Sequence, residues 1–339
     1  MGEKERLKPG KLAPIFLEKL LRKIPIRDER VIVGPKVGED AAVVNLGKKY
    51  LILKTDPITF TSKRIGWYAI NVNANDIAAM GGVPRFFLAT LLLPEEETTE
   101  ELVEEIFCDI ISSCEKLNIT LCGGHTEVTP GLKKPILVGM MVGEAEREEL
   151  VINDRAEVGD IILLTKGIAI EGTSIIASDF YEELKGKLEE KLIRRAMKLR
   201  EEPGLSVIKE ARIAVKTAHV HAMHDPTEGG LITGIYELAN AADKGTLIYQ
   251  REIPILPETE AICKIFNINP LGLIASGALL IVASPPEAKK IRKELIKNGI
   301  LVCKIGEIKE REFGVKMKNE EGEVIEILPL PSDELTKLL

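Results

Sequence analysis

An acidic stretch rich in hydroxyl and glycine residues carries the clearest chemical signal in this 339-residue sequence. Residues Asp225–Gly230 read Asp-Pro-Thr-Glu-Gly-Gly and stand directly before the amphipathic run Leu231–Ala242, which predicts a helix. Glycines let the backbone approach a ligand, and the first turn of a helix presents free N–H groups that favour phosphate. Asp225 would repel a bare phosphate, so a metal ion between the two makes better electrostatic sense. A simple capped helix start uses the same residue types and is the alternative.

Three further aspartates stand within or beside segments that read as protein core. Asp40 lies in Gly-Glu-Asp-Ala-Ala-Val, Asp56 follows the apolar run Tyr50–Leu53, and Asp76 lies in Asn-Asp-Ile-Ala-Ala-Met. Carboxylates are rarely buried without partners, and several that converge repel one another unless a hard cation neutralises them. Magnesium suits such a group because it takes oxygen ligands and is commonly completed by substrate phosphates. We therefore predict a metal site from four acids, each of which alone could also be a turn or cap residue: Asp40, Asp56, Asp76 and Asp225.

A second pair of glycines stands in Gly123–Glu127, which reads Gly-Gly-His-Thr-Glu. It follows the short apolar run Ile119–Leu121, so we expect a strand that leads into a loop. Two glycines followed by a hydroxyl and a carboxylate form a loop able to approach a phosphate or a ribose. By itself this pattern is a weak indication of a binding loop, and the acidic motifs elsewhere in the chain strengthen it.

Taken in order, these segments resemble the superfamily of aminoimidazole ribonucleotide synthase, the PurM-like proteins. The superfamily also contains formylglycinamidine synthase, selenophosphate synthetase, thiamine-monophosphate kinase and the HypE-type hydrogenase maturation proteins. The resemblance extends from Val37 to Ile308, and the sequence of Ala222–Leu231 is most similar to that of the HypE branch.

The resemblance implies an α+β, two-domain PurM-like architecture. An N-terminal ferredoxin-like α/β layer would form a barrel with the same layer of a second copy, and a C-terminal α/β sandwich would follow. It also implies a Mg-ATP cleft built from the two N-terminal domains of a homodimer. The resemblance further implies nucleotide contacts from Asn75, Gly123, Gly124, His125, Thr126, Glu127 and Thr227. For His125, the alternative role is a hydrogen bond within a turn.

The chain departs from the HypE pattern at its acceptor-side segments. The HypE motif His-Gly-x-Gly-Gly is replaced by Lys8–Leu12, and Pro329-Leu330-Pro331 is not followed by the cysteine that HypE proteins modify. A turn on the second-substrate side, Ile170–Gly172, keeps an acid but lacks the HypE histidine. Since no thiol stands there, we expect the HypE acceptor function to be absent. We also expect Ser332–Leu339 to be dispensable for ATP binding, because the expected nucleotide residues all lie upstream. Selenophosphate synthetase is disfavoured because its N-terminal cysteine or selenocysteine followed by lysine is absent.

These observations favour a Mg-ATP-dependent enzyme that hydrolyses ATP or transfers its γ-phosphoryl group to an oxygen of an unidentified acceptor. The acceptor could be a small molecule or borne by a protein. A thiamine-monophosphate kinase-like enzyme is one alternative. The other is a nucleotide-binding partner in hydrogenase maturation that does not turn over ATP, with maturation proteins as its partners.

Apolar runs and turn signals divide the chain into three parts: 1–36, 37–148 and 149–339. The first contains an amphipathic helix, Leu12–Lys23, and an extended linker, Val31–Lys36. The second reads β-β-α-β-α-β-β, which fits a nucleotide-binding α+β domain, and the acidic run Glu144–Glu149 ends it. The third is a further α+β domain with a short divergent tail. In it we expect strands near 161–165, 218–221, 246–249, 277–283 and 301–308, and helices near 173–181, 189–199, 205–211, 231–242 and 285–297.

Composition excludes several classes of protein. A net charge of −7 and 4% aromatic residues offer neither general attraction nor a stacking surface to nucleic acid. The sequence has no signal peptide and no apolar run of membrane-spanning length, so a cytoplasmic protein is expected. Five scattered cysteines lack metal-ligand spacing. His219 and His221 would share one side of a strand, but a third histidine at 224 breaks the geometry, so zinc is disfavoured.

Overall fold

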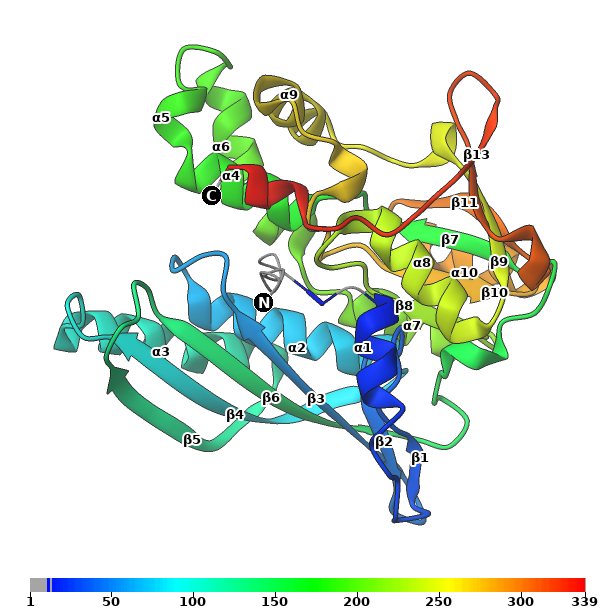
Figure 1. The fold of residues 1–339 in the computed structure, drawn as a ribbon, viewed down its shortest axis with the longest axis horizontal. Helices are drawn as coiled ribbons and strands as arrows, with labels where there is room; N and C mark the ends of the chain where they lie inside the picture. Colours follow the sequence, from blue (N-terminus) through cyan, green and yellow to red (C-terminus); the bar gives the residue numbers. More distant parts are fainter. Residues whose placement is uncertain (1–10, 13, 339) are drawn as a thin grey trace, which may run out of the picture.

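The computed structural model describes residues 11–12 and 14–338 of the chain. In Figure 1 the first half forms a layer of long strands with two helices on one side, and the second half forms a separate α/β unit above it. A six-stranded sheet and a seven-stranded sheet organise the two halves. The predicted two-domain α+β architecture is confirmed. The closure of the first layer into a barrel with a second copy stays a prediction.

The first sheet has the strand order β1-β2-β3-β6-β4-β5. Its strands β4 and β5 run parallel, and the other neighbours run antiparallel. The extended linker expected at Val31–Lys36 belongs in part to this sheet, because β1 pairs with β2. The strands are β1 (Val31–Val33), β2 (Ala42–Asn45), β3 (Tyr50–Ile58), β4 (Val83–Pro94), β5 (Thr120–Thr129) and β6 (Ile136–Ala145).

Helix α2 (Ile65–Ala79) lies between the two halves and is buried along all 15 of its residues. It packs on β3 and β6 of the first sheet and against α7 (Ile208–Thr217) and β8 (Ala222–His224) of the second half. Helix α3 (Glu100–Leu117) packs beside it. A helix that is buried all round suits such a central place. This position carries Asp76 into the interior of the molecule.

The other face of the first sheet presents apolar side chains to solvent. Phe87 and Met141 are fully buried, whereas their neighbours Phe86 and Met140 are 42% and 41% exposed. Successive side chains of a strand point to opposite faces, so the exposed pair lies on the face away from α2. Figure 1 draws both helices of this half on the same side of the sheet.

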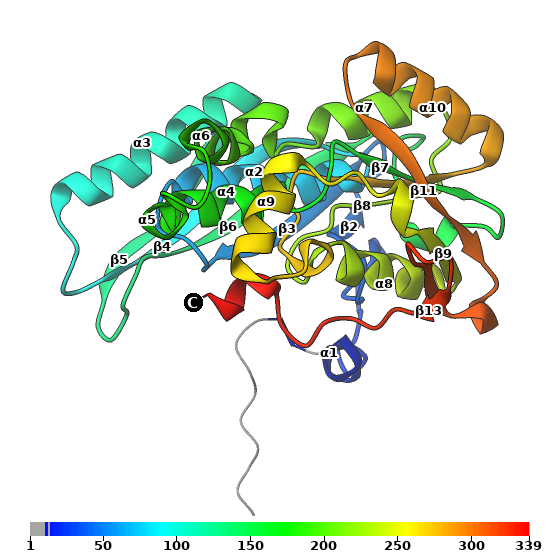
Figure 2. The same cartoon turned by 90° about the horizontal axis from the view of Figure 1, so that it is seen from above.

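The second sheet has the order β13-β12-β9-β11-β7-β10-β8. Helix α8 (Gly230–Ala242) packs on one face, and α7 packs with α10 (Pro285–Lys297) on the other, as Figure 2 shows from above. This arrangement agrees with the expected sandwich. The remaining strands are β7 (Ile161–Thr165), β9 (Gly245–Tyr249), β10 (Leu280–Ala283), β11 (Val302–Lys309), β12 (Val315–Lys318) and β13 (Val324–Glu326).

A group of helices stands at the end of the second half. Helix α4 (Ile170–Asp179) packs against α6 (Glu190–Lys198) and α9 (Pro257–Phe266), and the short α5 (Tyr181–Leu184) adjoins them. Helix α1 (Pro14–Leu21) precedes the first sheet, within the range expected for it.

A few elements of the structure differ from those that the sequence predicts. Helix α9 and strands β12 and β13 were not predicted, and the strand expected at 218–221 lies at Ala222–His224. Strand β13 has exposed side chains throughout, so it has no apolar pattern to reveal it.

The expected loop at Gly123–Glu127 is instead the middle of strand β5. Gly124 has φ +153°, and a Cβ atom there would fall on the carbonyl oxygen of Ala89 in β4. The glycine therefore permits close contact between two strands, rather than a turn around a phosphate.

Candidate metal and nucleotide site

Three buried aspartates from separate elements meet at the boundary between the two halves. Asp40 lies just before β2, Asp76 lies on α2, and Asp225 follows β8 directly. Each offers one carboxylate oxygen, and these oxygens all lie within 4.8 Å of one another. Within the described residues this is the one group of three or more His, Cys, Asp or Glu side chains placed to hold a metal ion. We name these three residues the aspartate cluster.

Several carboxylate oxygens of the aspartate cluster lack hydrogen-bond partners among the described residues. Asp40 Oδ2, Asp76 Oδ2 and both oxygens of Asp225 are buried and have no hydrogen-bond partner in the described part of the chain. Burial, with the charges of Asp56 and Asp40, raises the pKa of Asp76 to about 8 against the opposing effect of Lys54. Burial and the two neighbouring aspartates also raise the pKa of Asp225 well above its ordinary value. Mutually repelling carboxylates with free oxygens fit a hard divalent cation such as magnesium.

Lys54 on β3 links the fourth predicted acid to this cluster. Its Nζ lies 2.9 Å from Asp76 Oδ1 and 3.4 Å from Asp56 Oδ2. Burial alone would lower the pKa of this ammonium, but Asp76 and Asp56 raise it well above its ordinary value. The Asp56 side chain is 34% exposed and lies outside the group of three. The structure thus brings together three of the four predicted acids and places Asp56 at their edge.

His224 supports the cluster from within the second half. Its Nδ1 lies 2.6 Å from Asp40 Oδ1, and its Nε2 lies 3.1 Å from Glu237 Oε2 on α8. Burial opposes a charge on the ring, but the two carboxylates raise the pKa of His224 well above its ordinary value. A charged imidazolium between two carboxylates orients Asp40 and offsets part of the negative charge around it.

Asn75 lies next to the cluster but is engaged elsewhere. Its side chain is fully buried, its Nδ2 donates to the carbonyl of Leu205 at 2.9 Å, and its Oδ1 accepts from the N–H of Val207 at 2.9 Å. These bonds tie α2 to the segment before α7. The geometry therefore gives Asn75 a place in positioning α2 and Asp76, rather than one facing a nucleotide.

The Gly123–Glu127 segment lies apart from the cluster within one chain. Gly124 of β5, Ala89 of β4, Gly139 of β6 and Asp56 of β3 occupy one row across the sheet. Two strands separate Gly124 from Asp56, which corresponds to about 14 Å at the usual strand spacing. The structure therefore does not bring the two predicted regions together in a single chain.

The side chains of this segment point to solvent and contact one another. His125 and Glu127 are 66% and 50% exposed, with 3.1 Å between His125 Nε2 and Glu127 Oε2. Thr129 Oγ1 donates to Glu127 Oε1 at 2.9 Å. Thr126 is also exposed. These groups are available to a partner molecule rather than to the aspartate cluster of their own chain.

A cleft of about 750 Å³, here named the main cleft, opens beside Asp56 and Thr227. Lys11 enters it from the N-terminal segment, with its Nζ 3.1 Å from Thr227 Oγ1 and 3.6 Å from Glu237 Oε1. The replaced motif residues Lys8–Gly10 lie outside the described residues. Further residues that line the cleft are Pro57, Ile58, Thr59, Phe60, Thr61, Val72, Lys134, Glu171, Ile175, Glu228, Ile274, Ser276 and Thr336.

The inner wall of the main cleft carries two buried polar groups. Glu171 Oε2 and Ser276 Oγ have no hydrogen-bond partner among the described residues. Burial, with a contribution from Asp333 and Asp56, raises the pKa of Glu171 to about 7, while Ser276 opposes the shift. A carboxyl group with a pKa near neutrality can accept or donate a proton at physiological pH.

The start of α8 differs from the expected phosphate cradle. Gly229 has φ +82°, and a Cβ atom there would lie 2.3 Å from Thr233 Oγ1, so only glycine fits. Its N–H is not free, because it donates to Asp333 Oδ2 at 2.6 Å. The amide at this turn is thus used by a carboxylate of the same chain.

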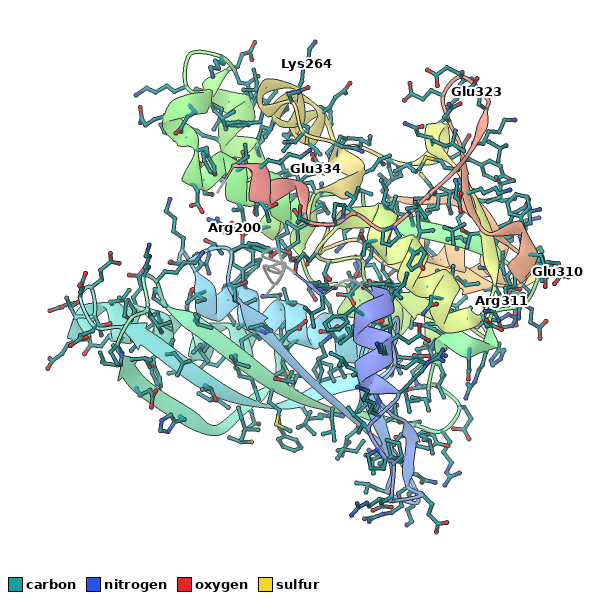
Figure 3. All side chains as sticks on the ribbon, in the orientation of Figure 1. Arg200, Lys264, Glu310, Arg311, Glu323 and Glu334 are labelled. Atoms are coloured by element: carbon teal, nitrogen blue, oxygen red, sulfur yellow. The ribbon has the colours of Figure 1, made fainter. Side chains whose placement is uncertain are left out.

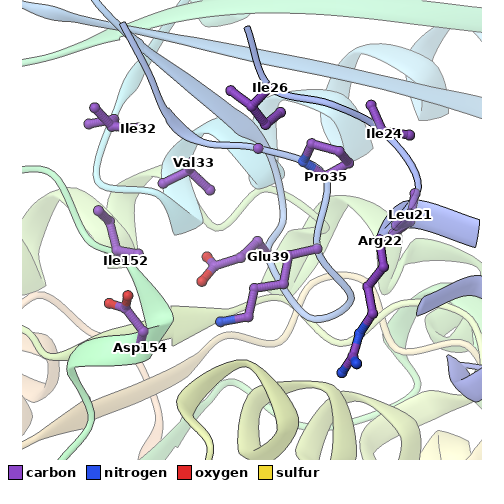
Figure 4. Close-up of a pocket in the computed structure, with 12 residues that line it drawn as sticks. Leu21, Arg22, Ile24, Ile26, Ile32, Val33, Pro35, Glu39, Ile152 and Asp154 are labelled. Atoms are coloured by element: carbon purple, nitrogen blue, oxygen red, sulfur yellow. The ribbon is translucent and has the colours of Figure 1, made fainter. Parts of the chain in front are cut away.

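A smaller cleft of about 350 Å³ is lined by Glu39, the neighbour of Asp40 in the sequence (Figure 4). Glu39 lies in its centre between aliphatic walls that include Ile24 and Ile152. Burial and Asp40 raise the pKa of Glu39 to about 7. With one central carboxyl group, it lacks the converging donors of the aspartate cluster.

The histidines before β8 form a separate contact. His221 Nδ1 lies 2.7 Å from Asp160 Oδ2, and the rings of His219 and His221 stand edge to face with 5.2 Å between their centroids. Neither residue belongs to the aspartate cluster of the described chain.

The sequence did not identify four residues around the site: His224, Glu237 and Lys54 beside the cluster, and Lys11 in the main cleft. A signal existed for two of them. His224 precedes Asp225 in the acidic motif, and Glu237 is a carboxylate inside the otherwise apolar run of α8. A charged residue within an apolar run calls for a partner, and here the partner is His224.

This fold and site define a two-domain α+β protein with a cluster of three buried carboxylates between its halves. The family model for the N-terminal domain of AIR synthase related proteins matches residues 38–145, and the model for the C-terminal domain matches residues 157–318. The chain therefore belongs to the AIR synthase related protein family.

Several curated proteins are similar over most of their length. A Methanocaldococcus jannaschii protein named for hydrogenase expression/formation is 26% identical over 320 residues, which cover 91% of this chain and 88% of the relative. A selenide, water dikinase of Clostridium botulinum is 29% identical and covers 73% of this chain and 69% of the relative. The carbamoyl dehydratase HypE of Rhizobium leguminosarum is 24% identical, with coverages of 76% and 72%.

Solved structures share the fold. HypE in complex with ATP superposes with a TM-score of 0.71 at 21% identity, over 86% of this chain and 88% of that one. ThiL complexed with AMPPCP and TMP gives 0.73 at 23% identity, over 96% and 98%. Within the part of the chain that the structure describes, no helix is both long and apolar enough to cross a membrane.

Proposed function

We propose that this protein is a Mg-ATP-dependent enzyme that transfers the γ-phosphoryl group of ATP to an acceptor oxygen or to water. The observation that supports this most strongly is the aspartate cluster, with its four buried carboxylate oxygens free of any partner in the described chain. Relatives in the same family carry names of ATP-using enzymes, and similar folds have been solved with ATP or an analogue. Hard oxygen donors beside a cleft suit a metal-bound polyphosphate.

Each residue of the site would have a defined task. Asp40, Asp76 and Asp225 would hold magnesium, with Asp56 as the fourth acid on the side of the main cleft. When bound, the ion would neutralise charge on the phosphate oxygens. Lys54 and Lys11 would add positive charge beside it.

The acceptor would lie in the main cleft, against Thr227 and Glu171. Its oxygen would form a bond to the γ-phosphorus while the bond from that phosphorus to the bridging oxygen breaks, and the electron pair would leave with ADP. Glu171 would take the proton of the acceptor hydroxyl, because its pKa of about 7 lets it act as a base near neutral pH. A cleft of about 750 Å³ is large enough for a small molecule.

The nucleotide site would be completed by a second copy of the chain. Gly123, Gly124, His125, Thr126 and Glu127 remain our candidates for nucleotide contacts, with Thr227 from the acidic motif. Because the β5 segment lies about 14 Å from Asp56 in its own chain, we place it against the cluster of a partner subunit. The exposed Phe86 and Met140 on the open face of the sheet support a homodimer that covers them.

Protein partners and location complete the proposal. A structure of a HypE–HypF complex shares this fold, so a protein-borne acceptor or a maturation partner is included. All five cysteines are free thiols in the described structure, which suits a reducing cytoplasm.

The test is calorimetry of ATP binding with Mg²⁺ and with EDTA, followed by ADP release in the presence of an acceptor panel that includes thiamine monophosphate. We expect ATP to bind only with Mg²⁺ and an acceptor to speed ADP release. ATP binding without any ADP formation would replace the enzyme with a nucleotide-binding partner protein. No Mg²⁺-dependent binding by the wild-type chain would refute the proposal.

A further inference from the structure

The chain after β13 returns to the candidate site. In Figures 1 and 2 it runs back past the start of α8 towards α4. Here we name Pro329–Lys337 the strap. Its residues Asp333 and Leu335 are 1% and 0% exposed, so the strap is packed into the molecule. Figure 3 labels Glu334 on it, below α9.

Asp333 bonds the turn that carries the acidic motif. Its Oδ2 accepts the N–H of Gly229 at 2.6 Å, and its Oδ1 accepts the N–H of Leu335 at 2.8 Å. Gly229 precedes the first residue of α8 and has no side chain to cap the helix. A carboxylate from a segment 104 residues away therefore does the capping, where an aspartate is favoured by the helix dipole.

Glu334 fixes the neighbouring segment in the same way. Its Oε2 accepts the N–H of Asn269 at 2.9 Å, and the Asn269 side chain accepts the N–H of Leu271 at 3.0 Å. Leu330 packs on Gly272, where a Cβ atom would lie 2.2 Å from Leu330 Cδ1. The strap thus holds the loop 269–272 as well as the start of α8.

The backbone of Thr227 lies between these two anchored segments. Its carbonyl accepts the N–H of Gly230 at 3.0 Å and the N–H of Ala275 at 3.2 Å. Thr227 in turn contacts Lys11 and lines the main cleft, and Thr336 of the strap lines the same cleft. Movement of Gly229 or of the loop 269–272 would therefore shift Thr227.

We propose that the strap is a working part of the candidate site and that Asp333 is the positioning residue through which it sets the Thr227–Gly230 turn. The kinetic consequence rests on the proposed function, whereas the anchoring of Gly229 does not. The expectation that Ser332–Leu339 is dispensable for ATP binding stays a prediction, because this assignment concerns turnover rather than nucleotide affinity.

The experiment compares Asp333→Ala and Asp333→Asn with wild type and with Glu326→Gln, an exposed control on β13. The first readout is hydrogen exchange at the Gly229 amide, which needs no nucleotide. We expect exchange at least about 10-fold faster in Asp333→Ala, since a buried donor loses its acceptor. Asp333→Asn keeps one acceptor oxygen and should fall between Asp333→Ala and wild type.

The second readout is kcat and KM for Mg-ATP turnover in the same proteins. We expect kcat to fall about 10- to 100-fold in Asp333→Ala, with partial rescue by Asp333→Asn and a smaller change in KM, because the turn is misplaced rather than removed. If Asp333→Ala does not fold, Asp333→Asn carries both readouts. The proposal would be overturned if the Asp333 variants showed the same Gly229 exchange rate and the same kcat as the Glu326→Gln control, whatever their melting temperatures. A wild type that binds no Mg-ATP would refute the proposed function while the exchange result still decides the anchoring.

Discussion

The aspartate cluster and the β5 segment Gly123–Glu127 both stand in sequence motifs, yet they differ in burial and in the partners of their side chains. The cluster is buried, is assembled from three elements of one chain, and keeps carboxylate oxygens without partners in the described structure. The β5 segment is exposed at a sheet edge, and its side chains bond to one another. The difference teaches that a complete motif set does not imply a complete site within one chain.

The largest effect is expected from a change inside the cluster. Asp76→Asn should weaken Mg-ATP binding by at least about 100-fold, because the site loses an anionic ligand for a hard cation. The same change should leave the melting temperature in EDTA equal or higher, since it relieves repulsion among buried carboxylates.

Calorimetry and thermal unfolding check both parts, with the exposed Glu95→Gln as the matched control. Unchanged ATP affinity in a folded Asp76→Asn protein would remove Asp76 from the metal ligands.

A charged side chain on the open face of the first sheet should prevent dimer formation. The aspartate cluster of one subunit would then no longer meet the β5 segment of the other. Phe86→Glu, or Met140→Glu, should give a monomer by light scattering, since a buried charge without a partner opposes assembly. The loss of the dimer should also weaken Mg-ATP binding, although every residue of the aspartate cluster is intact.

The exposed Ile325→Glu on β13 serves as the control and should leave assembly unchanged. A variant of Phe86 or Met140 that remains monomeric and still binds Mg-ATP with wild-type affinity would place the whole nucleotide site in one chain.

A smaller effect is expected from the acceptor side. Burial raises the pKa of Glu171 from an ordinary 4.5 to about 7, so the folded protein binds an extra proton between these values. Stability from this group is therefore present below pH 4.5 and is lost as pH rises through 7. Its loss is on the order of 3 kcal/mol at about 1.36 kcal/mol per pKa unit.

Glu171→Gln removes this titration and should flatten the fall of the unfolding free energy between pH 5 and 8. Denaturant unfolding at several pH values measures it. Parallel curves for wild type and Glu171→Gln would show that this carboxyl group is ionised at ordinary pH.

The sequence predicted most of the fold because its apolar periodicity matches the elements that cover each sheet. The order β2-β3-α2-β4-α3-β5-β6 agrees with the order predicted for the first half, and α10 lies at its expected range, 285–297. Short exposed strands such as β13 carry no such pattern. The glycine pair at 123–124 predicts a loop, whereas in the structure Gly124 allows close contact between two strands. The strand neighbour that requires a glycine there is Ala89, which the sequence does not identify.

The candidate site was predictable to the extent that its residues stand in motifs. Three of the four predicted aspartates meet, because each lies within or beside a core element. The family resemblance predicts a nucleotide contact from Asn75, whereas in the structure its side-chain amide bonds the backbone of Leu205 and Val207. The anchoring by Asp333 joins positions 104 residues apart, a pairing that only the folded chain reveals.

The most direct test of this account joins its two regions in one heterodimer. One subunit would carry Asp76→Asn in the cluster, and the other would carry Thr126→Glu on β5, whose added charge should repel phosphate. Neither homodimer should bind Mg-ATP. The heterodimer, purified through two different tags, should bind about one ATP per dimer, because one of its two composite sites is free of both changes. Calorimetric stoichiometry measures this. A Thr126→Glu homodimer that binds two ATP molecules, or a heterodimer that binds none, would contradict a site shared between subunits.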